Sequence, residues 1–263
     1  MYSTVAMALC ATLFTWFVTA LGAAVVLFFK NPRQMQLDLL LGFAAGVMIA
    51  ASFWSLLQPA IELASELGAA PWLIATPGFI CGAAFMWAAD KAVSLARRQN
   101  ALPCDEGGRR HFLLILSITL HNIPEGLAVG VAFGALGAGG YSDEALMAAI
   151  GVAVGIALQN FPEGAAVSLP LRRDGLSRKR SFLLGQASAM VEPLAGVAGA
   201  VLVLHTQRLL PFALSFAAGA MILVAVHELI PECQRRRDKF PYLATMGIVA
   251  GFSLMMLLDV ALG

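Results

Sequence analysis

The sequence predicts an all-α membrane protein with eight transmembrane helices. Of its 263 residues, 59% are hydrophobic and only 13% are charged, and the mean hydropathy is +0.80. This composition is too apolar for an ordinary soluble domain. A spanning helix needs about 20 mostly apolar residues, and we expect the whole chain, 1–263, to form one polytopic transmembrane domain. The eight segments of suitable length are about 4–29, 37–60, 72–95, 111–137, 144–170, 181–205, 211–233 and 241–262.

Basic residues gather in every second connection between the predicted helices. Because Lys and Arg are enriched in cytoplasmic loops, we expect these connections to be cytoplasmic. The other connections are acidic, with Arg208 as their one basic residue. Both termini should therefore lie outside, and the expected location is the bacterial cytoplasmic (inner) membrane. The basic residues are Lys30, Arg33, Arg97, Arg98, Arg109, Arg110, Arg172, Arg173, Arg178, Lys179, Arg180, Arg235, Arg236, Arg237 and Lys239; the acidic ones are Glu62, Glu66, Asp143 and Glu144.

The N-terminal segment and the cysteines add two expectations. Residues 1–29 contain no Lys or Arg, which predicts a first transmembrane helix and not a cleaved signal peptide. Cys10 and Cys81 fall within predicted helices, and Cys104 and Cys233 fall on the cytoplasmic side. Neither a disulfide nor a zinc ribbon is expected from these positions. The net charge of +1 gives no indication of a nucleic-acid partner.

The second and third predicted helices resemble the seventh and eighth. Residues 43–49 and 216–222 are identical at six of seven positions. Because the charge pattern orients the two copies oppositely, we predict an inverted repeat of helices 1–3 and 6–8 around helices 4 and 5, which is typical of transporters. The alternative is that small residues recur in any tightly packed membrane helix. The third and eighth helices share Gly78, Gly82, Met86 and Asp90 with Gly247, Gly251, Met255 and Asp259 at one constant offset.

One polar motif occurs twice inside apolar segments. Residues 121–126, His-Asn-Ile-Pro-Glu-Gly, recur as residues 159–164, Gln-Asn-Phe-Pro-Glu-Gly. Ionisable groups at membrane depth are costly and usually face an interior cavity. The repetition therefore predicts a shared ligand site between the fourth and fifth helices. In each copy the first and fifth residues, His121 and Glu125 or Gln159 and Glu163, lie on one helix face.

A proline in each motif removes a backbone hydrogen-bond donor. Pro124 and Pro162 should free carbonyl groups near Leu120 and Leu158. Such carbonyls can orient or bind an ion where they face a wet cavity. We expect these backbone groups to contribute to the site.

A third acidic residue, Glu192, lies near the middle of the sixth predicted helix. With Glu125 and Glu163 it gives three intramembrane carboxylates and no mid-membrane Lys or Arg. Ionised carboxylates are strongly unfavourable in a low-dielectric interior, and one or two divalent ions would relieve that cost. Imidazole, carboxylate and amide ligands without thiolate suit zinc, iron(II), manganese, cobalt or cadmium. We therefore expect divalent metal as the transported substrate and no organic cofactor.

Individual polar residues also have structural interpretations. Asn122 and Asn160 could link helices by hydrogen bonds. Met48 fits packing as well as thioether ligation. His227 and Glu228, toward the cytoplasmic end of the seventh helix, could receive a departing metal ion or form a solvated helix end.

Two other function classes are open to such a chain. An intramembrane metal-dependent hydrolase would use a bound metal to activate water. Residues 227–231, His-Glu-Leu-Ile-Pro, begin like a zincin motif but lack the second His. A structural helix bundle would use the buried polar groups only to hold its helices together. The missing His and the inverted repeat favour a transporter over an enzyme.

The doubled motif, Glu192 and the eight-helix arrangement resemble the ZIP (Zrt/Irt-like) family of divalent metal transporters, in its compact bacterial type. The resemblance spans essentially the whole chain. It implies import of zinc, iron(II), or related ions such as manganese, cadmium and cobalt, into the cytoplasm through a binuclear site. By position, it implies a first metal site of His121, Glu125, Gln159 and Glu163 and a second of Asn122, Glu125, Asn160, Glu163 and Glu192.

The chain departs from the family pattern at two of these positions. Many members of the family that it resembles carry His where this chain has Gln159, and some carry Asp where it has Asn160. Neutral amides bind metals more weakly than imidazole or carboxylate, so the metal preference is left open. We predict transport of divalent cations, zinc foremost, with metal ions and the lipid bilayer as partners and no nucleic acid. The sequence does not decide whether the chain forms a homodimer.

Overall fold

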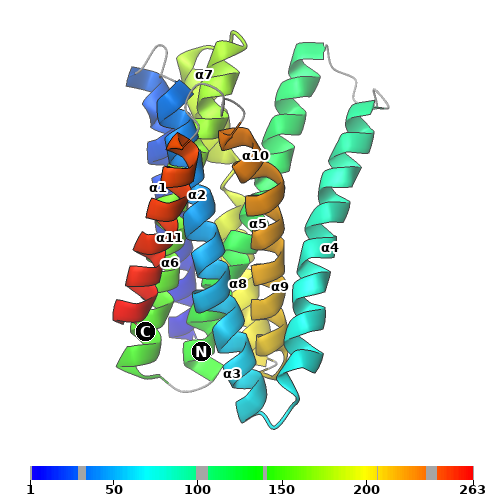
Figure 1. Cartoon of the computed structure of the whole chain (residues 1–263), viewed down its shortest axis with the longest axis vertical. Coiled ribbons are helices and arrows are strands. Elements are labelled where there is room, and N and C mark those ends of the chain that lie inside the picture. The colour runs from blue at the N-terminus through cyan, green and yellow to red at the C-terminus, as the bar shows by residue number, and fades with distance from the viewer. Residues whose placement is uncertain are drawn as a thin grey trace.

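The computed structural model describes residues 2–28, 34–98, 106–138, 141–205, 207–234 and 242–262, and all regular structure in these ranges is helical. Seven segments within them are long and apolar enough to cross a membrane. The remaining predicted span corresponds to α5, which carries the first polar motif and lies within the same bundle (Figure 1). The all-α membrane fold predicted from the sequence is confirmed.

The predicted helices map onto the observed ones in chain order. The first is α1 (Tyr2–Phe28); the second is α2 (Gln34–Ala51), η1 (Ser52–Leu57) and α3 (Gln58–Glu66); the third to fifth are α4 (Pro71–Arg98), α5 (Glu106–Ala138) and α6 (Asp143–Arg173). The sixth is α7 (Arg178–Ala187) and α8 (Val191–His205); the seventh, after a short turn η2 (Gln207–Leu209), is α9 (Leu210–Val224), η3 (Ala225–Leu229) and α10 (Ile230–Cys233); the eighth is α11 (Leu243–Leu262).

Two of the predicted helices contain π-helical turns, at η1 and η3. After each turn a backbone N–H bonds five residues back, from Gln58 to Phe53 and from Ile230 to Ala225. A proline follows immediately in both helices, and its missing N–H and bulky ring disturb the α-helical ladder before it. The two π turns occupy matching positions in the repeated sequence.

The sixth predicted helix is interrupted near its middle. The sequence predicts one continuous helix over 181–205, whereas the structure ends α7 at Ala187 and begins α8 at Val191. Pro193 has no N–H to donate to Ala189, whose carbonyl instead accepts from the backbone N–H of Glu192 at 3.0 Å. The result is a discontinuous membrane helix whose second half starts inside the bundle.

The predicted inverted repeat is visible in how the helices pack. α2 packs along α11 and α4 along α9, while α1 packs along α6 and α5 along α8. A Cβ at Gly46 would lie 2.0 Å from the carbonyl oxygen of Ile248, and one at Gly219 would lie 1.9 Å from that of Phe79. Gly46 and Gly219 occupy equivalent positions in the two copies of the repeat, and so do Phe79 and Ile248. The contacts of Gly82 with Phe216 and of Gly251 with Phe43 form a second equivalent pair.

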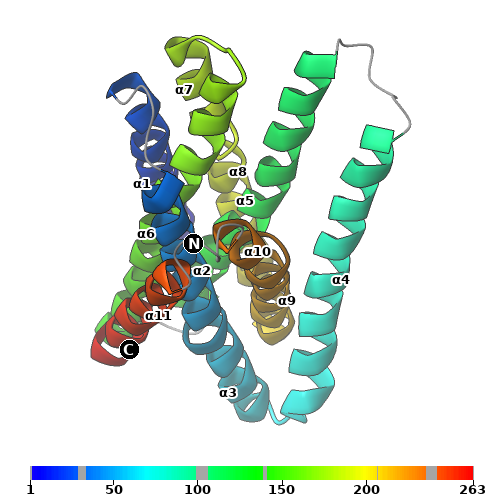
Figure 2. The same ribbon diagram turned by 45° about the horizontal axis from the view of Figure 1, so that its top comes forward.

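α4 forms one edge of the bundle (Figure 2) and packs mainly on α9. Its outer face exposes large apolar side chains to the surroundings. Lipid would cover such a face in a membrane, because an aqueous surface of this kind is unusual for a soluble protein. The exposed residues include Trp72, Leu73, Ile80, Phe85 and Trp87.

The structure describes three of the four cysteines and shows where the two chain ends lie. Cys10, Cys81 and Cys233 are free thiols. Cys104, Lys30, Arg33 and the basic run 235–239 lie outside the described residues, as do the side chains of Arg97, Arg98, Arg109 and Arg110. The two marked chain ends lie toward the same end of the bundle (Figure 1), as an even number of spans requires.

Candidate metal centre

The two polar motifs face each other from neighbouring helices. Glu125 on α5 and Gln159 on α6 are both fully buried. The Nε2 group of Gln159 donates to Oε1 of Glu125 at 2.9 Å. Glu125 also lies within electrostatic range of Glu163 and Glu192. The three intramembrane carboxylates therefore share one region of the bundle.

Glu192 lies in the first turn of α8, where the partial positive charge of a helix N-terminus favours a carboxylate. The Nδ2 group of Asn160 donates to both of its oxygens, at 2.9 Å and 3.0 Å. Two hydroxyl groups from α1 complete its surroundings. Thr15 donates to Oε2 at 2.5 Å, and Thr19 lies 3.5 Å from Oε1.

Asn122 contacts the backbone at the interruption between α7 and α8. Its Nδ2 group donates to the backbone carbonyl of Ser188 at 3.0 Å. The sequence pointed to carbonyls near Leu120 and Leu158, within the motif helices. The freed carbonyl that the structure shows at the site is that of Ser188, because Pro193 breaks the sixth helix there.

Several buried oxygen atoms at this site accept no hydrogen bond. Buried acceptors are almost always paired in folded proteins, so four such atoms near one another need an explanation. Amide and carboxylate oxygens are ligands that divalent cations accept. The donor set therefore fits a cation. The four atoms are Oδ1 of Asn122, Oε2 of Glu125, Oε1 of Gln159 and Oδ1 of Asn160.

His121 points to the seventh helix. Its Nε2 atom lies 2.9 Å from Oε1 of Glu228, which belongs to the π turn η3. Glu163, almost completely buried on α6, lies within electrostatic range of both His121 and Glu228. Glu228, which the sequence placed toward an exit, thus reaches the motif on α5.

The predicted ligands are neighbours, but they are engaged with one another. Across the described ranges, no three His, Cys, Asp or Glu side chains come together in a group that could hold a metal ion. His121 is paired with Glu228, and Glu192 is surrounded by hydroxyl and amide donors. Metal binding by the full predicted set would require these contacts to rearrange.

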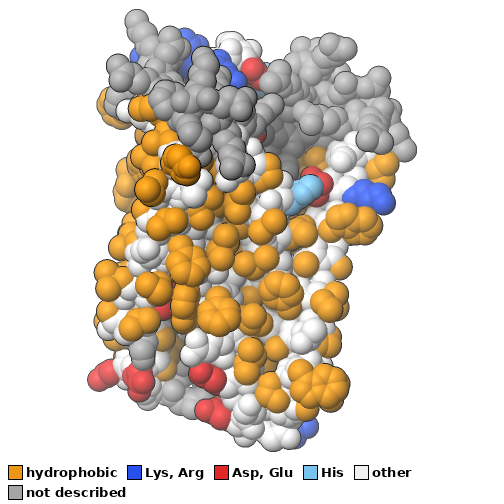
Figure 3. Space-filling view, in the orientation of Figure 1, with side chains coloured by type: hydrophobic (Ala, Val, Ile, Leu, Met, Phe, Trp, Pro, Cys, Tyr) orange, Lys and Arg blue, Asp and Glu red, His pale blue; other side chains and the backbone are white. Residues whose placement is uncertain are grey.

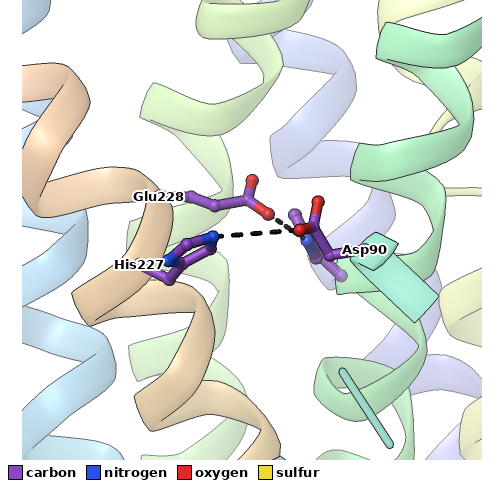
Figure 4. Close-up of polar contacts among 4 residues, drawn as sticks. Asp90, His227 and Glu228 are labelled. Carbon is purple, nitrogen blue, oxygen red and sulfur yellow. Dashed lines mark ion pairs between the residues drawn. The ribbon is translucent and has the colours of Figure 1, made fainter. Parts of the chain in front are cut away.

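The last two predicted site residues are His227 and Met48. His227 is 64% exposed and its Nε2 atom lies 3.8 Å from Oδ2 of Asp90 on α4. Figure 4 shows His227 and Glu228 extending from the same turn, with dashed lines for the ion pairs that they form. Met48 is buried in the main apolar core, which also contains Val129 and Ile156. That position fits packing, and metal binding by Met48 stays a prediction.

Sequence reasoning missed four residues at or near the site. Thr15 and Thr19 lie beside Glu192, the carbonyl of Ser188 accepts from Asn122, and Asp90 partners His227. The available signal for the threonines was their spacing, since Thr12, Thr15 and Thr19 fall on one face of an otherwise apolar helix.

Known proteins similar to this chain are transporters. Residues 97–259 match the family model described as ZIP Zinc transporter. The chain is 39% identical to the zinc transporter ZIP11 of Homo sapiens, over 100% of this chain and 99% of that protein. It is 38% identical to the zinc transporter ZIPB of Bordetella bronchiseptica, over 93% of this chain and 78% of that protein. It is 35% identical to the zinc transporter GufA of Myxococcus xanthus, over 97% and 98%.

These relatives are named as transporters and not as enzymes, which removes the hydrolase alternative. The resemblance inferred from the doubled motif is confirmed, and the seven apolar spans make the chain an integral membrane protein. Its helical bundle, buried acceptor oxygens and similarity over the full length agree: this chain is a member of the ZIP zinc transporter family.

Proposed function

We propose that the chain imports divalent metal ions into the cytoplasm, zinc foremost, and accepts iron(II), manganese, cadmium and cobalt with lower preference. The substrate passes through the site formed by α5, α6 and α8. The observation that carries this proposal is the set of four buried acceptor oxygens without hydrogen-bond partners, on Asn122, Glu125, Gln159 and Asn160. They lie beside acidic groups with which no Lys or Arg of the described residues forms an ion pair.

The transported ion has two candidate positions that share Glu125 and Glu163. The first adds His121 and Gln159, and the second adds Asn122, Asn160 and Glu192. The hydrogen bond between Gln159 and Glu125 supports the first grouping. The two bonds from Asn160 to Glu192 support the second.

The pair of His121 and Glu228 suggests the direction of release. Glu228 is 31% exposed while His121 is 8% exposed, so an ion leaving His121 would meet a more accessible carboxylate next. His227 and Asp90 lie beyond it, and His227 is more exposed again. Side-chain exposure thus rises from His121 to Glu228 to His227, and the turn η3 that carries the last two leads directly into α10 (Figure 1).

The distribution of charge supports an orientation with both termini outside. Figure 3 shows acidic side chains gathered at the lower end of the bundle, where α3 ends and α6 begins with Asp143 and Glu144. The basic residues at the end of α6 and the start of α7 lie at the opposite end. Because basic loops stay cytoplasmic, the end with α7 and α10 faces the cytoplasm of a bacterial inner membrane.

The test is metal uptake by liposomes that contain the purified protein. Zinc, cadmium, iron(II), manganese and cobalt would each be offered alone and then in competition with zinc. The proposal expects saturable uptake of zinc and inhibition by the others. Empty liposomes supply the background. Folded protein that moves none of the five ions would overturn the proposed function.

A further inference from the structure

The carboxylate of Glu192 differs from that of Glu125 because both of its oxygens accept hydrogen bonds. The Nδ2 group of Asn160 approaches both oxygens, and the hydroxyl of Thr15 approaches Oε2. Thr19 has a single hydroxyl hydrogen, and its Oγ1 lies 3.2 Å from the carbonyl of Thr15 but 3.5 Å from Oε1 of Glu192, so it donates to that carbonyl. Asn160 and Thr15 are therefore the donors to this carboxylate.

Glu125 shows the opposite condition. Its Oε1 atom accepts from Gln159, and its Oε2 atom is buried without a partner. The fully buried oxygens without hydrogen bonds thus belong to Glu125 and to the three amides, and neither oxygen of Glu192 is among them. An ion entering the site finds vacant oxygens around Glu125, but it must displace hydrogen bonds to reach Glu192.

The hydroxyl of Thr15 has a choice of acceptors, and the distances decide it. A threonine hydroxyl carries one hydrogen. Thr15 Oγ1 lies 3.0 Å from the carbonyl of Thr12 and 2.5 Å from Glu192 Oε2. The carboxylate oxygen is the nearer of the two acceptors, so the hydrogen is directed to Glu192.

Close packing of α1 on α8 keeps these hydroxyls in place. A Cβ at Gly196 of α8 would lie 2.5 Å from Cγ2 of Thr12, one turn from Thr15. Thr12 itself donates only within α1, to the carbonyls of Ala8 and Leu9. The threonine face therefore has two functions: Thr12 packs, while Thr15 donates to Glu192.

We propose that Thr15 is a positioning residue that holds Glu192 away from direct metal ligation, so that the site binds one ion tightly and a second only weakly. This inference rests on the proposed function, since it concerns the second position of that same site. The Thr15 hydroxyl and the Asn160 amide supply the favourable contacts that a second cation would otherwise give to Glu192.

Weak binding at the second position suits transport. An ion must bind well enough to enter and loosely enough to leave. Removing the Thr15 hydroxyl would leave one oxygen of a buried carboxylate without its closest donor, and a cation would then be the best remaining partner. The altered site should retain a second ion and release it slowly.

The experiment compares Thr15→Val, which keeps the shape and removes the hydroxyl, with Thr15→Ser, which keeps the hydroxyl. Thr12→Val is the matched control, because it removes a threonine hydroxyl from the same buried face without touching Glu192. Zinc bound per chain would be measured by equilibrium dialysis of the purified proteins. The zinc-induced rise in melting temperature and the kinetics of zinc uptake by liposomes would be measured in parallel.

We expect wild-type protein, Thr15→Ser and Thr12→Val to bind one zinc tightly, and Thr15→Val to bind two. In Thr15→Val the melting temperature should rise further with zinc than in wild type, and the KM and kcat of uptake should fall together by about tenfold. Thr19→Val should stay close to wild type in the same quantities, because the Thr19 hydroxyl donates to the carbonyl of Thr15.

Three results would overturn the inference: a Thr15→Val protein that matches Thr12→Val, a loss of zinc in Thr15→Val, or failure of Thr15→Ser to restore wild-type stoichiometry. If Thr15→Val does not fold, Thr15→Ala, which also removes the hydroxyl, takes its place and is held to the same expected results. Failure of the proposed function is separate, since wild-type protein would then neither bind nor transport any divalent ion.

Discussion

At the scale of single residues, the buried acceptor oxygens decide what the site can do. The Oε2 atom of Glu125 accepts no hydrogen bond and lies in the region shared with Glu163 and Glu192. This oxygen is therefore available to a cation. His227 differs from Glu125, because its side chain is 64% exposed. Its one ion pair among the described residues is with Asp90.

Replacing Glu125 by Gln keeps its shape and removes its charge. Zinc uptake by liposomes should fall by more than about 100-fold, since even residues that only support metal ligands cost 10- to 100-fold when changed. His227→Ala serves as control and should retain uptake within about threefold. A Glu125→Gln protein with a tenth or more of wild-type uptake would exclude Glu125 as a ligand.

Sequence reasoning identified which residues meet but not how they are paired. The helical spacing of His121, Glu125, Gln159 and Glu163 predicted one shared site, and these residues do face the same region. The pairing of His121 with Glu228 could not be predicted, because it depends on the π turn of the seventh helix. Thr15 was missed because threonine hydroxyls in a helix commonly bond to carbonyls of their own helix, so the spacing of the threonines does not by itself indicate a contact with Glu192.

At the scale of helices, interruptions place the polar groups. The number and type of helices could be predicted from apolar length, but the π turns and the break between α7 and α8 could not. These features arise where Pro59, Pro193 and Pro231 remove backbone donors. The sequence shows each proline, whereas only packing decides whether a helix kinks, forms a π turn or breaks.

Pro193→Ala should let α7 and α8 join, because an alanine at this position supplies the missing backbone donor. Glu192 would then move away from Asn160, and Ser188 would no longer present its carbonyl to Asn122. We expect zinc uptake to fall by about tenfold or more, while the melting temperature stays constant or rises. Pro211→Ala, in the first turn of α9, is the control. Unchanged uptake by Pro193→Ala would show that the break has no part in the site.

At the scale of the whole molecule, the inverted repeat produces two equivalent helix seams, one where α4 packs on α9 and one where α11 packs on α2. The repeat could be predicted because glycines and aromatic residues recur at a fixed offset. The structure gives its physical reason: each glycine lets a carbonyl of the partner helix approach where a Cβ cannot fit. Gly82 meets Phe216 and Gly251 meets Phe43, both at about the same distance.

Gly82→Ala and Gly251→Ala should therefore destabilise the protein by similar amounts. Each added Cβ would lie 1.9 Å or 2.0 Å from a backbone oxygen, so the helices must separate, at a cost of about 1–3 kcal/mol in unfolding free energy. Ala84→Val, on the exposed face of α4, should change it by less than about 0.5 kcal/mol. Equilibrium unfolding in detergent would measure all three. Destabilisation by only one of the two glycine variants would contradict equivalent seams.

The central claim is that acidic and amide groups buried in the bundle bind and pass divalent cations. Zinc uptake into liposomes, followed for wild-type protein and Glu125→Gln side by side, tests it most directly. The account predicts rapid, saturable zinc entry with wild-type protein and entry near the empty-liposome background with the variant. Equal entry in both, with both proteins folded, would contradict it.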